Sequence, residues 1–193
     1  MITIKLVTEH SELEGIKKLQ QENLKKNLAD QEAETEGFVT AEYTMEFLER
    51  MHNEKPSVIA KDGDLIAGYA LAAVKAIRYE HELLVDLFDT IDKTHYQNRL
   101  LKDSNYIVVG QLCVSKNYRG LGLVYQMYQH FRKTLAPDFD YCITDVAKNN
   151  PRSLKVHLKS GFVVIDELQY GGVGFDIVLW DWNSRPDSPE KAK

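Results

Sequence analysis

Cysteine, long apolar segments and excess positive charge are all scarce in this chain of 193 residues, and each shortage excludes a class of protein. The two cysteines, Cys113 and Cys142, form no CxxC pair and indicate no disulfide framework, which favours a reducing, cytoplasmic environment. The longest uncharged runs, residues 104–115 and 120–131, are shorter than the ~18–20 residues of a membrane span, so we expect no membrane partner. Lys and Arg number 24 against 29 Asp and Glu, so the clustered cations that bind nucleic acid are lacking, and we expect no nucleic-acid partner.

One folded domain is what the remaining composition predicts. Apolar residues make up 44% of the chain and aromatic residues 10%, which is enough to bury a core and excludes disorder throughout. Strand-like and helix-like segments alternate along residues 1–182, which predicts an α/β fold with a mixed sheet. Residues 183–193 hold two of the five prolines and no large apolar side chain, so we expect a disordered tail there.

A helical insertion is expected over about residues 76–104, because Leu84, Leu87 and Ile91 recur there at helical spacing. The same segment carries an acidic stripe, formed by Glu82, Asp86, Asp89 and Asp92. Such a stripe is typical of a solvated helix face, which is the interpretation we favour. It would also suit a lid that attracts a cationic amine, or a packing surface for a second copy in a homodimer.

A glycine-rich turn between a buried strand and an amphipathic helix is the most informative segment. It reads Arg119-Gly120-Leu121-Gly122-Leu123-Val124. Helix N-termini bind anions, glycines let the backbone approach them, and the arginine adds a positive charge. A dinucleotide fingerprint would need a third glycine where Tyr125 stands, and a P-loop would need Lys-Ser or Lys-Thr after the second glycine. From these residues alone, a phosphate site and a plain structural turn are equally favoured.

A second segment opens another helix further along the chain. Asn150 is a strong N-cap residue, and Pro151 suits the first helical position. Eleven residues after this asparagine, Gly161-Phe162 marks a helix stop that leads into a strand.

Together the two segments resemble the GNAT superfamily of acyl-CoA-dependent N-acyltransferases. The pyrophosphate loop of that family reads Arg/Gln-x-x-Gly-x-Gly/Ala, which Arg119 and Gly122 match and from which Val124 departs at the last position. The later family motif, an asparagine followed by a helix that ends in Gly-Phe, is matched by Asn150 and by residues 161–162.

The resemblance, which is close over residues 107–162, implies a single GNAT-like domain over residues 1–182. Its sheet would be mixed and mostly antiparallel, with a splayed central pair of parallel strands and helices on both faces. The pantetheine arm of acetyl-CoA would lie between strands 107–115 and 141–146, and its pyrophosphate would rest on the N–H groups of the glycine-rich turn. The implied cofactor-binding residues are Leu112, Cys113, Val114, Arg119, Gly120, Leu121, Gly122, Leu123, Val124, Asn150 and Ser153.

The resemblance also implies direct attack of a neutral amine on the thioester of acetyl-CoA, with no metal. The N–H of Val114 would polarise the thioester carbonyl. Many members of the family place a tyrosine seven residues after the motif asparagine to protonate the leaving thiolate, and here that position is His157. As imidazolium it would donate a proton and as imidazole it would hydrogen-bond the sulfur, whereas a helix histidine that merely packs is the alternative. Asp145 is the best candidate for the base, and a solvated aspartate at a strand end is the alternative interpretation.

The predicted function is therefore N-acetyl transfer from acetyl-CoA to a primary amine of a small molecule or a peptide, in a ternary complex. The alternative is a catalytically weak module of the same fold that binds or senses acyl-CoA. Val124 and His157, which depart from the family pattern, motivate that alternative.

Overall fold

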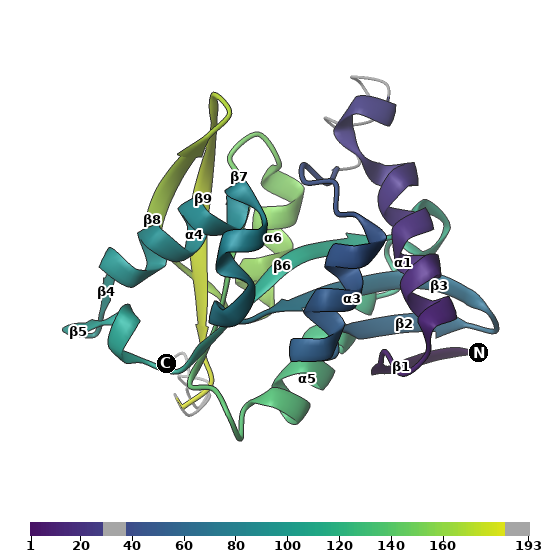
Figure 1. The fold of residues 1–193 in the computed structure, drawn as a ribbon, viewed down its shortest axis with the longest axis horizontal. Coiled ribbons are helices and arrows are strands. Elements are labelled where there is room, and N and C mark those ends of the chain that lie inside the picture. Colours follow the sequence, from purple (N-terminus) through teal and green to yellow (C-terminus); the bar gives the residue numbers. More distant parts are fainter. Residues whose placement is uncertain (29–37, 184–193) are drawn as a thin grey trace, which may run out of the picture.

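The computed structural model describes residues 1–28 and 38–183, so the tail predicted over residues 183–193 lies almost wholly outside the described residues. Figure 1 shows the helices and strands in chain order. They are β1 (Ile2–Leu6), α1 (His10–Asn23), α3 (Met45–Glu54), β2 (Val58–Asp62), β3 (Leu65–Ala73), α4 (Glu82–Lys93), β4 (His95–Tyr96), β5 (Arg99–Leu100), β6 (Tyr106–Val114), α5 (Leu123–Leu135), β7 (Tyr141–Ala147), α6 (Pro151–Lys159), β8 (Val163–Tyr170) and β9 (Val173–Asp181).

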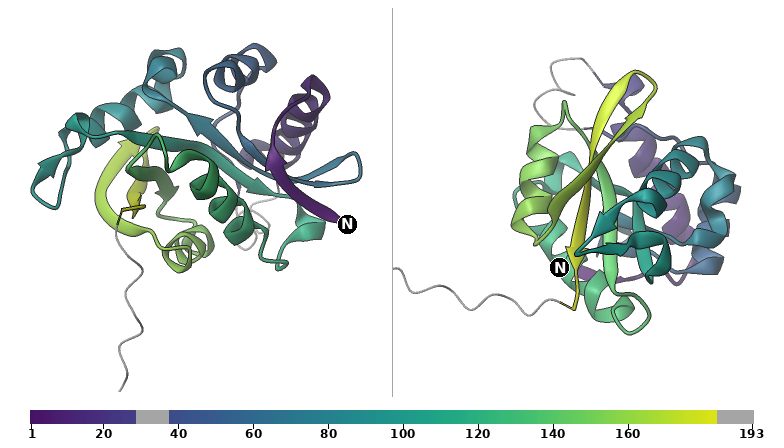
Figure 2. Two further views of the ribbon diagram at one scale, coloured as in Figure 1. Left: turned by 90° about the horizontal axis from the view of Figure 1, so that it is seen from below. Right: turned by 90° about the vertical axis from the view of Figure 1, so that its left-hand side faces the viewer.

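A seven-stranded sheet in the order β1-β2-β3-β6-β7-β9-β8 forms the centre of the domain. The pair β6–β7 is parallel, and the other neighbouring strands of this sheet run antiparallel. Helices α1, α3 and α4 pack on one face, and α5 and α6 pack on the other (Figure 2). The predicted fold class, a mixed and mostly antiparallel sheet with a central parallel pair and helices on both faces, is confirmed.

The periodicity of the sequence explains how the layers are built. In α5 the apolar side chains recur every three or four residues, so Leu123, Met127, Phe131 and Leu135 lie buried in the core under the sheet. The first half of strand β6, residues 106–109, is buried on both faces because a helix layer covers each of them, and its sequence is correspondingly apolar. An extra residue at Gly110 forms a bulge in β6, since Leu71 of β3 pairs with Gln111 and Ala72 pairs with Val109.

The segment between β3 and β6 consists of a 3₁₀ turn (Lys75–Glu80), helix α4, the small β4–β5 hairpin and a second 3₁₀ turn (Leu101–Asp103). Arg78 in the turn donates hydrogen bonds to Asp89 and to Asp92, and the hydroxyl of Tyr106 donates to Asp92 at 2.6 Å. The acidic stripe of α4 is thus divided. Asp89 and Asp92 bind Arg78, and Asp92 also attaches the segment to Tyr106 at the start of β6. Glu82 and Asp86 are exposed, as expected for a solvated face.

Gly161 ends helix α6 with φ +105°, and a Cβ atom added there would lie 2.7 Å from Nε1 of Trp180. We expect Gly161→Ala to lower the free energy of unfolding by about 2–4 kcal/mol, because backbone strain adds to a clash in the core. Chemical denaturation measures this loss. Gly171→Ala is the matched control, since its φ is +56° and an added Cβ meets nothing within 4 Å. Equal losses in the two variants would contradict the steric explanation.

Candidate functional site

An opening between β6 and β7 forms the centre of the candidate site. The two strands pair only from Tyr106 to Val108 on β6 and from Tyr141 to Ile143 on β7, and then they separate. At the point of separation the hydroxyl of Thr144 donates to the carbonyl oxygen of Val109 at 2.7 Å. This side-chain bond takes the place of the next backbone hydrogen bond between the two strands. Beyond this point the edge of β6 that faces β7 has no strand partner among the residues that the structure describes.

The backbone of β6 presents N–H groups to this opening. The N–H of Ser115, just after β6, donates to the carbonyl oxygen of Ala67 in β3 at 2.8 Å. Successive residues of an antiparallel strand direct their N–H groups to opposite edges, so the N–H groups of Leu112 and Val114 point into the opening. This is where the sequence analysis predicted a group that polarises a carbonyl.

The glycine-rich turn follows directly at the mouth of the opening. Gly120 has φ +82° and Gly122 has φ +71°, and Gly122 is the N-cap of α5 with no side-chain cap. A Cβ atom at either position would meet nothing within 4 Å, so the backbone conformation, not a lack of space, favours glycine there. The first N–H groups of α5 have no acceptor inside the helix, and they form the positive end of its dipole.

Arg119 lies between this turn and the end of β6. Its Nε donates to the carbonyl oxygen of Val114 at 3.3 Å, and its Nη2 donates to Oδ1 of Asn23 at 3.0 Å. Asn23, the last residue of α1, was not predicted as part of the site, because its proximity depends on a contact across 96 positions of sequence. These bonds hold the guanidinium at the mouth of the opening.

A cleft of about 480 Å³ runs along β6 from the opening to the two helix N-termini. All predicted cofactor-binding residues except Leu121 line it, and the side chain of Leu121 is instead exposed. The cleft also contains three cationic side chains, those of Arg119, Arg152 and Lys159. A cleft with free strand N–H groups at one end and a helix N-terminus with cations at the other suits an elongated ligand with anionic groups.

Asn150 begins α6 at the far wall of the cleft. Its Oδ1 accepts a hydrogen bond from the N–H of Ser153 at 3.1 Å, and Pro151 follows at the first helical position, as the sequence indicated. The side-chain oxygen of Asn150 is thus used to shape the helix. Asn150 and Ser153 both line the cleft, and Ser153 is partly buried.

His157 is buried and its two ring nitrogens are both hydrogen-bonded. Nδ1 lies 2.8 Å from the carbonyl oxygen of Ser153, which only accepts, so the proton sits on Nδ1. Nε2 therefore accepts from the hydroxyl of Tyr128 on α5, at 2.7 Å. Burial lowers the pKa of His157 to about 4. Of the roles the sequence left open, this geometry favours a packing histidine and disfavours an imidazolium acid.

A second, smaller cavity of about 80 Å³ adjoins the cleft, and Phe38, Val39, Leu112, Ser153 and His157 line both. Asp145 lines its inner wall, one residue beyond Thr144 on β7. Burial raises the pKa of this carboxyl from its usual value near 4 to about 6, so it is mostly ionised at neutral pH yet basic enough to take a proton.

Cys113 lines the main cleft, but its chemistry does not suit a nucleophile. It is 7% exposed, and burial raises the pKa of its thiol to about 12, so the reactive thiolate form is suppressed. Within residues 1–28 and 38–183, no group of three His, Cys, Asp or Glu side chains is arranged to hold a metal ion. None of the helices described there is long and apolar enough to cross a membrane.

Comparisons with known proteins agree with this geometry. The family model described as "Acetyltransferase (GNAT) family" matches residues 21–162, whereas a search of curated proteins found no match. Among solved structures, the NatC complex bound to Gag peptide and CoA is similar with a TM-score of 0.64 and 16% identity, covering 93% of this chain and 98% of that one.

Two bacterial structures are similarly related. The ribosomal-protein-S18-alanine N-acetyltransferase from Escherichia coli has a TM-score of 0.63 and 12% identity, covering 98% of this chain and 99% of that one. The protein YncA from Salmonella typhimurium, solved with its cofactor acetyl-CoA, has a TM-score of 0.62 and 10% identity, with 99% of each chain covered. At these identities the structural likeness shows the fold.

Replacing the buried carboxyl of Asp145 tests the electrostatics of the smaller cavity. A carboxyl whose pKa is raised by folding destabilises the folded state as pH rises through its folded pKa, here about 6. We therefore expect Asp145→Asn to gain about 1–3 kcal/mol of unfolding free energy at pH 8 and nothing at pH 4, after allowance for partial exposure. Denaturant titrations at both pH values measure this. Asp64→Asn, in the exposed β2–β3 turn, is the control, and a gain that does not depend on pH would contradict the burial of Asp145.

Proposed function

Because the chain belongs to the acetyltransferase (GNAT) family and is an acyl-CoA-dependent acetyltransferase, we propose that it moves an acetyl group from acetyl-CoA to a primary amine. The amine belongs to a small molecule or a peptide, and transfer is direct, within a ternary complex in the cytoplasm. One observation carries the proposal: the free edge of β6, with the N–H groups of Leu112 and Val114, leads straight to the uncapped N-terminus of α5 at Gly122.

The residues of the cleft suit acetyl-CoA. The free edge of β6 would pair with the amides of the pantetheine arm, and the N–H groups of Gly120 to Val124, with Arg119, would bind the diphosphate. Val124 replaces a small residue of the family pattern but keeps its main-chain N–H, so it leaves this donor in place. Arg152 and Lys159 add positive charge for the remaining phosphate.

In this proposal the protein itself would remove a proton from the amine and stabilise the charge that develops on the carbonyl oxygen. When bound, acetyl-CoA supplies an activated thioester carbonyl. The N–H of Val114 would stabilise the negative charge that develops on its oxygen. Asp145, directly or through water, would take the proton that the amine loses as its nitrogen bonds to the acetyl carbon. The carbon–sulfur bond then breaks, and the thiolate of coenzyme A takes a proton from solvent, since His157 already donates its proton to Ser153.

Release of free thiol tests the proposed transfer directly. We expect the protein, incubated with acetyl-CoA and a panel of small primary amines and peptides with free N-termini, to release coenzyme A only when an amine is present. A thermal-shift titration with acetyl-CoA runs in parallel, and ligand at 100 times its Kd should stabilise the protein by about 2.7 kcal/mol. A shift without turnover on any amine would favour the alternative, a module that binds acyl-CoA, and no shift would contradict both.

Reversing the charge of Arg119 tests the diphosphate site. We expect Arg119→Glu to weaken coenzyme A binding by more than about tenfold, because it brings like charges together at the mouth of the cleft. Isothermal titration calorimetry measures the Kd. Lys133→Glu, in the exposed last turn of α5, changes the net charge equally and should leave the Kd within about twofold. Equal weakening by both variants would contradict a local role for Arg119.

A further inference from the structure

Gln111 is a polar side chain buried in β6, and it lies beside the smaller cavity. Its Nε2 donates to the carbonyl oxygen of Ala41 at 2.7 Å. Its Oε1 accepts twice, from Nε2 of Gln20 at 2.9 Å and from the hydroxyl of Tyr69 at 2.7 Å. Because the carbonyl of Ala41 only accepts, the amide orientation of Gln111 is fixed, and its polar atoms bond to α1, to β3 and to the segment that precedes α3.

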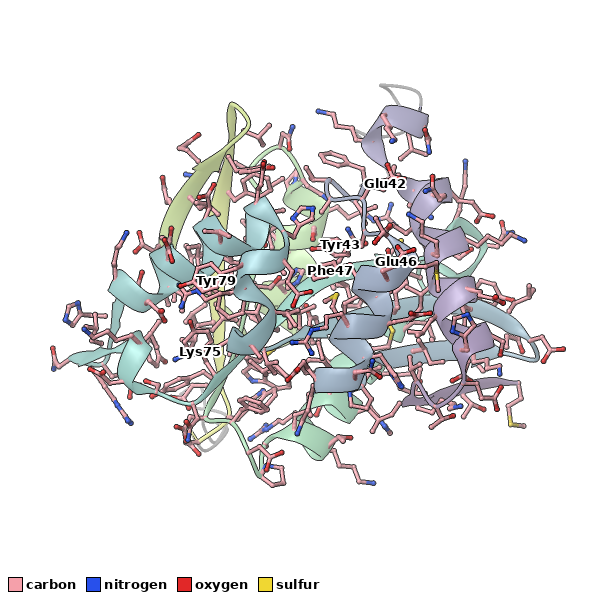
Figure 3. All side chains as sticks on the ribbon, in the orientation of Figure 1. Glu42, Tyr43, Glu46, Phe47, Lys75 and Tyr79 are labelled. Carbon is pink, nitrogen blue, oxygen red and sulfur yellow. The ribbon has the colours of Figure 1, made fainter. Side chains whose placement is uncertain are left out.

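A second set of bonds closes the network around the bulge of β6. Oε1 of Gln20 accepts from the N–H of Tyr43 at 2.9 Å, and the hydroxyl of Tyr43 donates to the carbonyl oxygen of Gly110 at 3.0 Å. Figure 3 shows Tyr43 beside Phe47 at the start of α3, on the face of the sheet that α1 and α3 cover. We call this network the Gln111 clamp; it comprises the side chains of Gln20, Tyr43, Tyr69 and Gln111 and the backbone carbonyls of Ala41 and Gly110.

The clamp joins the segment of residues 38–44 to strand β6, and so connects two parts of the site. Residues 38–44 form neither a helix nor a longer strand, yet residues 38–41 line the smaller cavity together with Asp145. The bulge at Gly110 sets the direction of β6, and with it the positions of the N–H groups of Leu112 and Val114. Through the clamp, one wall of the smaller cavity is fixed relative to the strand that would hold the thioester.

We propose that Gln111 is a positioning residue, which aligns the wall that receives the amine with the N–H groups that polarise the thioester. This inference rests on the proposed function. A misalignment of about 1 Å between reacting groups is enough to cost on the order of 100-fold in rate, so the five hydrogen bonds at this junction, four of them buried, matter for turnover. They lie on the opposite side of β6 from the diphosphate site, so coenzyme A binding would depend on them little.

Gln111→Leu keeps the size of the side chain and removes all three of its hydrogen bonds. With acetyl-CoA and the amine from the panel that the wild type converts fastest, we expect kcat to fall about tenfold or more and the KM of the amine to rise. The Kd of coenzyme A should stay within about twofold. Gln21→Leu is the matched control, because Gln21 ties α1 to Glu42 of the same segment through an exposed bond at 2.6 Å, and both constants should stay near wild type.

Gln111→Glu provides a rescue that a purely structural role would not show. A glutamate keeps the acceptor for Gln20 and Tyr69, but it donates to the carbonyl of Ala41 only when protonated. We therefore expect its kcat, divided by that of the wild type at the same pH, to rise as pH falls. A ratio independent of pH, or a Gln111→Leu variant that matches Gln21→Leu, would overturn the proposal.

A measurement without turnover separates this inference from the proposed function. If the wild type releases no thiol with any amine, the proposed function fails, and hydrogen exchange still tests the clamp. In Gln111→Leu the N–H of Tyr43 should exchange at least about tenfold faster, whereas amides of β9 should be unchanged. Unchanged exchange at Tyr43 would overturn the clamp itself, and a thermal unfolding scan of each variant verifies that it is folded.

Discussion

Two parallel strands that pair over only three residues are the constraint on which the rest of the structure depends. A strand edge inside a protein carries N–H and C=O groups that need partners. The N–H and C=O groups of Leu112 and Val114 on β6 are not paired with β7. The surrounding elements keep this edge open. Thr144 occupies the carbonyl at the point where the strands separate, and the bulge at Gly110 changes the course of β6. The unmet hydrogen-bonding capacity of one strand is thus what makes a ligand site out of a continuous sheet.

The site divides into two electrostatic environments on either side of that strand. Toward α5 and α6, an uncapped helix N-terminus and three cationic side chains favour anions. Toward α1 and α3, the smaller cavity holds one partly buried carboxyl, whose pKa burial raises to about 6. The low polarity that strengthens the N–H groups toward a developing charge is the same property that makes Asp145 a better base. In the proposed acyl transfer, this low polarity would therefore act on both the thioester carbonyl and the attacking amine.

What the sequence predicted depends on how local each feature is. The turn from Arg119 to Val124 and the cap at Asn150 were predictable, because positive φ angles, helix caps and helix stops depend on neighbouring residues. Periodicity predicted an α/β fold with a mixed sheet, whereas the central parallel pair was implied by the family resemblance, and this fold class was confirmed. Asn23 and Gln20 were not predicted, since the first meets Arg119 across 96 positions and the second meets Gln111 across 91. The pKa of Asp145 depends on burial, which no spacing reveals.

His157 shows why a position that matches a family motif need not keep the role of the usual residue. A tyrosine there would bring a hydroxyl with a proton to give, whereas this imidazole is held as a neutral tautomer between Ser153 and Tyr128. Its ring joins α5 to α6, the two helices whose N-termini bound the cleft. Tyr128 is itself buried among Phe162 and Trp180, so charging the imidazole would place an ion in an aromatic core. The side chain that departs from the family pattern thereby stabilises the geometry of the cleft, and the proposed proton transfers would involve Asp145 and solvent instead.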